Sequence, residues 1–297
     1  MKVSRFAPSP TGRLHLGHAF SAIRAHDLVR AEGGRFLLRI EDIDPGRARE
    51  TFVAGIEEDL AWLGLEWDGP AVRQSARLPA YAEALERLKA MRLVYPCFCT
   101  RAAIAASASA PHGEDGPVYP GTCRALIPAQ RAARMGEPHC WRLDMAKALR
   151  IASPFPLGTN EERRTAPSLF WHDATAGWLH ADPLPQGDVI LARKDAPTSY
   201  HLAVTVDDAA QGVTDVVRGV DLFQATDVHR LLQALLGLPT PCYHHHPLLT
   251  GADGERLAKR RGSPTLADLR EGGADPVALA ADLRAGRLPI GFGAAKT

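Results

Sequence analysis

The sequence predicts an α/β protein built on a parallel sheet with helices on both faces and interrupted by an insertion. Apolar strand patterns at residues 3–6 and 35–40 enclose a helical pattern at 19–25, and a strand, a helix and a strand in this order begin a parallel sheet. Residues 97–124 then break the pattern, because they are rich in Ala, Pro and Gly and lack a strong period. We expect this stretch to open the insertion.

Composition limits the class of protein. The 297 residues are 45% hydrophobic and can bury a sizeable core. The sequence has no run of eighteen apolar residues and no apolar N-terminal signal segment, so we expect a cytoplasmic protein without a membrane partner. The net charge of +1 indicates nothing about nucleic acid. Five cysteines, an odd number, argue against a secreted disulfide framework and leave metal binding or reduced thiols.

Hydrophobic periodicity predicts the remaining elements in order. Helices are expected at 47–63, 81–91 and 227–236, with short helical patterns near 266–269 and 277–283. Strands are expected at 140–143, 187–193, 199–208, 213–219 and 242–249. These elements divide the chain into a first half of the sheet domain at 1–96, an insertion at 97–187, a second half at 188–249 and a terminal segment at 250–297.

The loop between the first strand and the first helix suits an anion. Residues 5–18 have the sequence Arg-Phe-Ala-Pro-Ser-Pro-Thr-Gly-Arg-Leu-His-Leu-Gly-His, a stiff turn into a helix start, where unpaired amides attract phosphate. His15 and His18 share one helical face and can donate hydrogen bonds to phosphate oxygens. Gly17 leaves room for a base or ribose. A proline-rich turn before a surface helix, with solvated histidines, explains the local pattern equally well.

An acidic residue follows the second strand at the edge where ligands bind in parallel sheets. Glu41 comes directly after the strand at 35–40, and its carboxylate would lie beyond the carboxyl end of that strand, near the loop at 5–9. A carboxylate at this place can hold an ammonium group. A helix-capping or salt-bridged surface acid is the alternative interpretation.

Three cysteines in the insertion indicate a metal site. Cys97, Cys99 and Cys123 offer three thiolates, and such a set strongly favours zinc, here in a structural role. A fourth ligand is needed, and chemistry alone favours His112 over Tyr119 because imidazole is the commoner partner. Reduced structural thiols beside a core tyrosine are the alternative. Cys140 and Cys242 stand alone in the sequence and are expected to be buried thiols.

The run Cys242-Tyr-His-His-His246 also offers metal-binding groups. Adjacent residues of a strand face opposite ways, so only His244 and His246 of the three histidines share a side. We therefore favour a strand that lines a ligand site over a metal cluster.

Two motifs far apart in the chain resemble those of a known family. The loop at 5–18 is followed near the other end by Glu-Arg-Leu-Ala-Lys-Arg-Arg-Gly at 255–262. Together they resemble the two signature motifs of class I aminoacyl-tRNA synthetases, and the form Arg-Phe-Ala-Pro-Ser-Pro-Thr-Gly is similar to that of the glutamyl branch. The resemblance covers Val3 to about Leu266 and is weakest at 125–187. It implies a Rossmann-like catalytic domain.

The resemblance implies a set of site residues. Catalysis would rest on His15, His18 and Lys259, and ATP binding on the same three with Gly17. The glutamate pocket would comprise Arg5, Phe6, Ala7, Pro8, Ser9, Glu41, Tyr200 and Arg218. The zinc ligands would be Cys97, Cys99, Tyr119 and Cys123, as in the small glutamyl-type synthetases that modify queuosine.

Arginines and lysines supply the charge that this chemistry needs. The guanidinium of Arg218 can pair through two hydrogen bonds with the side-chain carboxylate of glutamate, although a strand-end salt bridge is the alternative. Lys259 would stabilise charge on pyrophosphate, as would the neighbouring Arg256, Arg260 and Arg261. Arg163, Arg164 and Lys194 could contact RNA backbone, because phosphate contacts dominate nucleic-acid affinity; solvated surface charge is the alternative. By the resemblance, the insertion would cradle the acceptor end of tRNA.

The implied reaction is activation of L-glutamate with ATP and Mg²⁺, without tRNA, to glutamyl-adenylate and pyrophosphate. Because the chain ends within forty residues of Lys259, it resembles the stand-alone catalytic domains that transfer glutamate to queuosine at the wobble position of tRNA(Asp). We expect one structural Zn²⁺ per chain and a monomer. A truncated enzyme that charges the 3′ end of tRNA and a non-catalytic synthetase-like RNA-binding protein are the alternatives.

Overall fold

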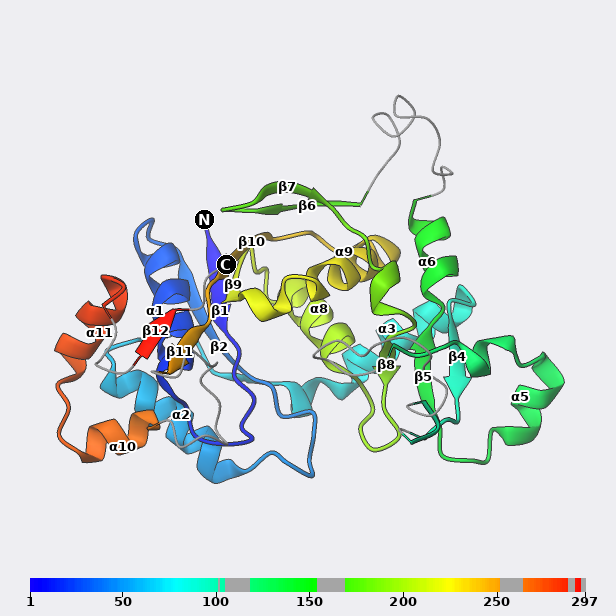
Figure 1. The fold of residues 1–297 in the computed structure, drawn as a ribbon, viewed down its shortest axis with the longest axis horizontal. Helices are drawn as coiled ribbons and strands as arrows, with labels where there is room; N and C mark the ends of the chain where they lie inside the picture. The colour runs from blue at the N-terminus through cyan, green and yellow to red at the C-terminus, as the bar shows by residue number, and fades with distance from the viewer. Residues whose placement is uncertain (101, 105–117, 154–168, 252–263, 288–291, 295–297) are drawn as a thin grey trace.

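The structure is a computed structural model that describes the chain except residues 101, 105–117, 154–168, 252–263, 288–291 and 295–297; of residues 251 and 292–294 only the backbone is described. Most strands and helices lie in a central α/β body, and a smaller antiparallel sheet lies beside it (Figure 1). None of the helices in the described part is long and apolar enough to cross a lipid bilayer.

The central body contains two sheets that meet edge to edge. The first has the parallel order β1 (Val3–Phe6), β2 (Arg35–Ile40) and β3 (Val72–Arg73). The second has the order β7 (Gly177–His180), β6 (Phe170–Asp173), β10 (Cys242–His246) and β9 (Asp215–Gly219). The expected parallel pairing is confirmed for β6, β10 and β9, whereas β7 runs antiparallel to β6. The amide of Thr214 donates to the carbonyl of Val3 at 2.9 Å and joins β9 to β1.

Helices pack on both faces of these strands, as the sequence predicts. Helix α1 (Leu16–Arg30) and α2 (Glu50–Trp62) share one apolar core with β2, and α3 (Leu78–Ala90), α8 (Tyr200–Ala210) and α9 (Ala225–Leu236) contribute to the other. Val217 belongs to the first core and Val216 to the second. Neighbouring residues of a strand point to opposite faces, so this pair of valines marks the two sides of the sheet.

A second region carries the cysteines. Strands β4 (Val94–Cys97), β5 (Cys140–Leu143) and β8 (Ile190–Ala192) form an antiparallel sheet. The short helices α5 (Pro128–Arg134) and α6 (Met145–Ala152) flank it (Figure 1). Strand β6 comes from the segment 97–187 but pairs with β10 in the central body. The domain boundaries stay a prediction.

The last described segment returns to the first helix. Helix α10 (Leu266–Glu271) packs against α2, and helix α11 (Pro276–Arg284) packs against α1 (Figure 1). Strands β11 (Leu249–Gly251) and β12 (Phe292–Ala294) form an antiparallel pair. Thr265 forms a β-bridge with His15, and the amide of Leu266 donates to the carbonyl of Leu14 at 2.9 Å. The remaining short elements are η1 (Gln74–Arg77), η2 (Thr122–Ala125), η3 (Leu184–Gln186) and η4 (Val220–Leu222).

One expected element has the wrong type. The strand predicted at 199–208 is wrong, because Tyr200–Ala210 forms helix α8. This segment is apolar and contains the β-branched Val204 and Val206, a composition that periodicity alone cannot separate from a buried strand. Helix α8 packs between α3 and α9, so three successive residues, Leu202, Ala203 and Val204, are buried. Because the helix is buried on several sides, its sequence is apolar without a helical period and resembles that of a buried strand.

Candidate active site

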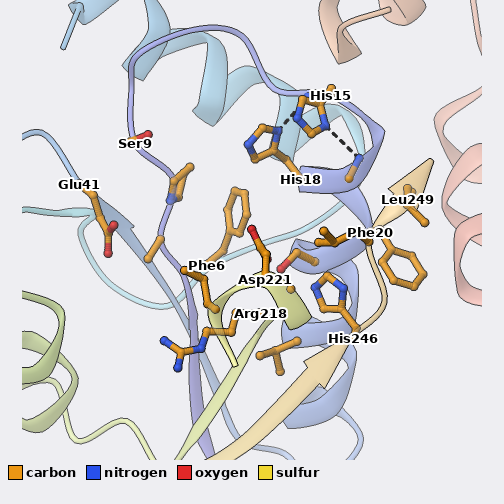
Figure 2. Close-up of a pocket in the computed structure, with 18 of the residues that line it drawn as sticks. Phe6, Ser9, His15, His18, Phe20, Glu41, Arg218, Asp221, His246 and Leu249 are labelled. Carbon is orange, nitrogen blue, oxygen red and sulfur yellow. Dashed lines mark hydrogen bonds between the residues drawn. The ribbon is translucent and has the colours of Figure 1, made fainter. Parts of the chain in front are cut away.

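A pocket of about 290 Å³ opens at the carboxyl ends of β1, β2, β9 and β10. The structure brings into it every predicted glutamate or nucleotide residue that it describes, namely Arg5, Phe6, Ala7, Pro8, Ser9, His15, Gly17, His18, Glu41, Tyr200 and Arg218. Figure 2 shows His15 and His18 together at the start of α1, with Glu41 across the pocket. This edge of parallel strands is where open α/β sheets bind ligands.

The two histidines form the start of helix α1. The amide of Gly17 donates to Nδ1 of His15 at 3.1 Å, and the amide of His15 donates to Nδ1 of His18 at 3.1 Å. The ring centroids lie 3.9 Å apart. Both rings accept at Nδ1, so each neutral imidazole carries its proton on Nε2. The cap therefore fixes which nitrogen of each ring donates.

Gly17 makes room for His15. A Cβ atom at position 17 would lie 3.0 Å from Cε1 and 3.2 Å from Nδ1 of the His15 ring, which is closer than side chains normally approach. The sequence suggested space for a base or ribose at this point. The nearest atoms in the described structure belong instead to the imidazole that caps the helix.

Buried charges fix the floor of the pocket. Arg5 and Arg39 both donate to Oδ1 of Asp208, at 2.8 and 2.7 Å. Burial disfavours the charged form of Asp208, but the two guanidinium groups hold its carboxyl pKa below the usual range. Arg5 was predicted to contact substrate. In the structure it also pairs with Asp208 of helix α8.

Glu41 belongs to the same charge network, but its negative charge is less well neutralised than that of Asp208. Nη2 of Arg39 donates to Oε1 of Glu41 at 3.4 Å. Burial raises the pKa of the Glu41 carboxyl, while Arg39 and Arg5 counteract part of this rise and Asp208 adds to it. An incoming cation would therefore stabilise the ionised carboxylate.

Arg218 is held by a set of neutral groups. Its Nε donates to Nε2 of His245 at 3.1 Å, and its Nη1 contacts Nδ1 of His229 at 3.2 Å and the hydroxyl of Tyr200 at 3.4 Å. Nη2 also donates to Oγ1 of Thr226. Among the described residues, no carboxylate lies within salt-bridge distance of this guanidinium, so the strand-end salt bridge is absent there.

The histidines around Arg218 stay uncharged. Burial, together with the positive charge of Arg218, lowers the pKa of His245 to about 4 and that of His229 well below its usual value. Nδ1 of His245 lies 2.8 Å from Oδ2 of Asp173, which orients the ring so that Nε2 can accept from Arg218. The sequence did not predict that His245 and His229 contact Arg218. The residues next to them in the sequence give no sign of this contact.

Further residues complete the pocket. Phe20 and Ser21 enter from α1, Asp221 and Leu222 from η4, and His246, Leu248 and Leu249 from β10 and the segment after it. His246 was expected on a strand that lines the ligand site, and the structure places it there. Phe20 packs edge-on against His246 at 5.1 Å. The sequence predicted the helical pattern that contains Phe20 but no role for it in a site.

Some predicted residues lie outside the described part of the chain. They are Lys259 with Arg256, Arg260 and Arg261, the insertion residues Arg163 and Arg164, and the alternative zinc ligand His112. The flanks of the lysine segment are described: Leu249 of β11 lines the pocket and Thr265 pairs with His15. Lys194 donates to the carbonyls of Phe98 and Cys99 at 3.2 and 3.1 Å, and its contact with RNA stays a prediction.

The cysteine cluster has the composition and spacing of a metal site. Ligand atoms of Cys97, Cys99 and Cys123 all lie within 4.8 Å of one another, and the three cysteines are free. Sγ of Cys99 lies 3.5 Å from Sγ of Cys123 and 3.9 Å from the hydroxyl of Tyr119. Zinc–sulfur bonds of about 2.3 Å place tetrahedral thiolates roughly 3.8 Å apart. These residues could hold a metal ion. Cys140 is buried beside them, as expected. Cys242 was also expected to be buried, which is wrong, because it begins strand β10 and is only partly buried.

Comparison with known proteins identifies the family. The family "tRNA synthetases class I (E and Q), catalytic domain" matches residues 2–154 and 161–288. A glutamyl-Q tRNA(Asp) synthetase of Rhodobacter capsulatus is 50% identical over 291 residues, which are 95% of this chain and 98% of that protein. One of Symbiobacterium thermophilum is 46% identical over 93% of this chain and 83% of that protein.

The fold of this chain is also similar to those of solved synthetase structures. A glutamate–tRNA synthetase of Elizabethkingia anophelis superposes with a TM-score of 0.76 at 26% identity over 95% of this chain. This chain spans 61% of the length of that synthetase. The chain is an enzyme of the ligase type; it belongs to the class I tRNA synthetases of the E and Q kind and, within them, to the family of the glutamyl-Q tRNA(Asp) synthetases.

Proposed function

We propose that this chain activates L-glutamate with ATP, without tRNA, and transfers the glutamyl group to queuosine at the wobble position of tRNA(Asp). The observation that carries the proposal is one pocket in which Glu41 and Arg218 present opposite charges beside the His15–His18 cap. The choice of acceptor rests on the printed names of the relatives.

The charges of the pocket suit glutamate. The ammonium group of the substrate would compensate the buried Glu41 carboxylate, whose pKa is raised by burial. The side-chain carboxylate would accept from Arg218, which is 5% exposed and surrounded by neutral histidines. A charged acceptor is favoured over the amide of glutamine at such a site.

Activation needs positioning and charge stabilisation. A carboxylate oxygen of glutamate attacks the α-phosphorus of ATP, the bond between the α-phosphorus and the bridging oxygen breaks, and pyrophosphate leaves with Mg²⁺. Nε2–H of His15 and of His18 would donate to phosphate oxygens. Lys259 would contact pyrophosphate. The flanks of its segment support this role, because Leu249 lines the pocket and Thr265 pairs with His15, which also lines it. An acceptor hydroxyl then attacks the activated carbonyl, and AMP leaves.

The acceptor would bind beside the pocket. A neighbouring cavity of about 350 Å³ shares Ser9, Glu41 and Tyr200 with it and is lined further by Arg47 and Arg193. Both arginines pair with Asp44, at 2.8 and 3.2 Å. A nucleoside in this cavity would lie next to the activated carbonyl.

We also propose that the Cys97, Cys99, Cys123 and Tyr119 groups bind one structural Zn²⁺. The amide of Cys123 donates to the Tyr119 hydroxyl at 2.7 Å, which is the kind of hydrogen bond that orients a metal ligand. The ion would fix the loop after β4 against η2.

Transfer of labelled glutamate tests the function. We expect glutamate-dependent ATP–pyrophosphate exchange in the absence of tRNA, and label on tRNA(Asp) that carries queuosine but not on tRNA(Asp) that lacks it. Lys259→Ala should lower exchange about a hundred- to a thousandfold. An alkali-labile ester on unmodified tRNA(Glu) would instead show a 3′-end charging enzyme, and absence of exchange would show a non-catalytic protein.

A further inference from the structure

We propose a second zinc site, formed by Asp215, Cys242, His244 and His172, where strands β9 and β10 begin. It lies at the opposite end of these strands from the pocket, which is lined by residues 217–219 and His246. It is also separate from the Cys97 cluster, whose ligands belong to β4 and the segment around η2. The inference therefore stands apart from the proposed function.

Strand register brings the four side chains together. Cys242 of β10 is in register with His172 of β6 on one side and with Asp215 of β9 on the other. His244 is two residues beyond Cys242 and so shares its face of the sheet. Three neighbouring strands therefore present a thiol, a carboxylate and two imidazoles in one place.

The ligand atoms of Asp215, Cys242 and His244 lie close enough together to share one ion, and His172 would reach that ion from beside Cys242. Nδ1 of His172 lies 3.3 Å from Sγ of Cys242, and Nε2 of His244 lies 2.8 Å from Oδ1 of Asp215. The ligand atoms of Asp215, Cys242 and His244 all lie within 4.8 Å of one another. Zinc bonds of about 2.0–2.3 Å require tetrahedral ligand atoms roughly 3.3–3.8 Å apart, a spacing inside the observed range.

The surroundings of Asp215 leave one oxygen for the ion. Oδ2 accepts from the hydroxyl of Thr214 at 2.7 Å, which orients the carboxylate and turns Oδ1 toward His244. Lys2 is the nearby cation, and it pairs with Glu32 at 2.6 Å. The Asp215 side chain is 7% exposed and that of His244 is 20% exposed, so the groups are shielded but reachable.

The donor set selects the class of ion. One thiolate, two imidazoles and one carboxylate suit zinc, whereas Mg²⁺ and Ca²⁺ prefer oxygen ligands only. Bound zinc would cross-link β6, β10 and β9. Strand β6 returns to the central body from the cysteine region, so the ion would fasten this strand to the sheet.

Cobalt substitution in the full chain tests the site. We expect the full chain to bind two equivalents of Co²⁺. Cys242→Ser should lower this to one equivalent and remove the sulfur-to-cobalt absorption of one thiolate, whereas Cys99→Ser should weaken only the other cluster. Two equivalents of Co²⁺ bound by folded Cys242→Ser, with unchanged sulfur-to-cobalt absorption, would overturn the proposal.

Two further variants guard against misfolding. His172→Gln and Asp215→Asn should weaken Zn²⁺ binding at this site at least about tenfold, while Cys140→Ser, made in a thiol outside this site, should retain it. Each variant is first compared with wild type by circular dichroism. Equal zinc affinity in folded His172→Gln, Asp215→Asn and wild type would contradict the assignment, and glutamate-dependent exchange, measured in parallel, reports on the pocket separately.

Discussion

At the scale of single residues, the site depends on how each polar group is held. His15 and His18 accept hydrogen bonds from backbone amides at Nδ1, and Arg218 contacts ring nitrogens of the neutral His245 and His229. Glu41 faces the same pocket with a carboxyl pKa that burial raises. The hydrogen bonds of the histidines and of Arg218 are in place before substrate binds, which is the form of preorganisation that lowers barriers.

Gly17→Ala tests the packing of the cap. The new Cβ would press on the His15 ring, so we expect kcat for glutamate-dependent exchange to fall about ten- to a hundredfold. Stability should change little, because the gain of about 1 kcal/mol from alanine in a helix is offset by a weakened His15 cap, which is worth about the same. The matched control is Gly55→Ala in α2, where a Cβ meets no atom within 4 Å. Equal exchange rates in Gly17→Ala and wild type would contradict this account of the glycine.

Arg218→Gln tests the carboxylate contact. Loss of a hydrogen bond to a charged group costs about 1.5–3 kcal/mol, which is roughly ten- to a hundredfold in kcat/KM for glutamate. The KM for ATP should change little. Arg284→Gln, which removes a pair between half-exposed side chains with Asp27, serves as the control and should be near neutral. Unchanged kcat/KM for glutamate in folded Arg218→Gln would rule out the contact.

At the scale of elements, the pocket depends on where strands end and helices begin. The carboxyl ends of β1, β2, β9 and β10 supply Arg5, Glu41, Arg218 and His246, and α1 supplies the histidine cap. Helix α8 contributes Tyr200 to the pocket and Asp208 to the charges below it. Strand β10 separates two sets of groups, since His245 contacts Arg218 while His244 contacts Asp215.

The buried histidine at β10 predicts a pH dependence of stability. The folded pKa of His245 is about 4, whereas its ordinary value is 6.5. The unfolded chain therefore binds a proton that the folded chain excludes, and stability is lost as pH falls from about 6.5 to about 4. The slope from one such histidine is about 1.4 kcal/mol per pH unit.

Urea unfolding of His245→Gln across this pH range measures that slope. Glutamine can accept from Arg218 and donate to Asp173, so the variant should fold and lose the contribution of one histidine. His180→Gln, at an exposed position of β7, should keep the slope of wild type. Identical slopes for His245→Gln and wild type would contradict the assignment of a neutral His245.

At the scale of the whole molecule, most of the fold could be predicted from periodicity, and the residues gathered in the pocket from motifs. Strands at 3–6, 35–40 and 213–219 are confirmed, with β9 starting at Asp215. Helix α8 was mistaken for a strand because burial on several sides removes the helical period. The pairing of Asp208 with Arg5 and Arg39, and of His245 with Asp173, could not be predicted, because each joins segments that are distant in sequence.

The central claim is that one pocket holds both glutamate and the phosphate of ATP. A crystal structure of the enzyme with a non-hydrolysable glutamyl-adenylate analogue tests it most directly. We predict the side-chain carboxylate of the analogue against Arg218, its ammonium group against Glu41, and its phosphate mimic beside His15 and His18. An analogue bound outside this pocket, or bound with its side-chain carboxylate away from Arg218, would contradict the account.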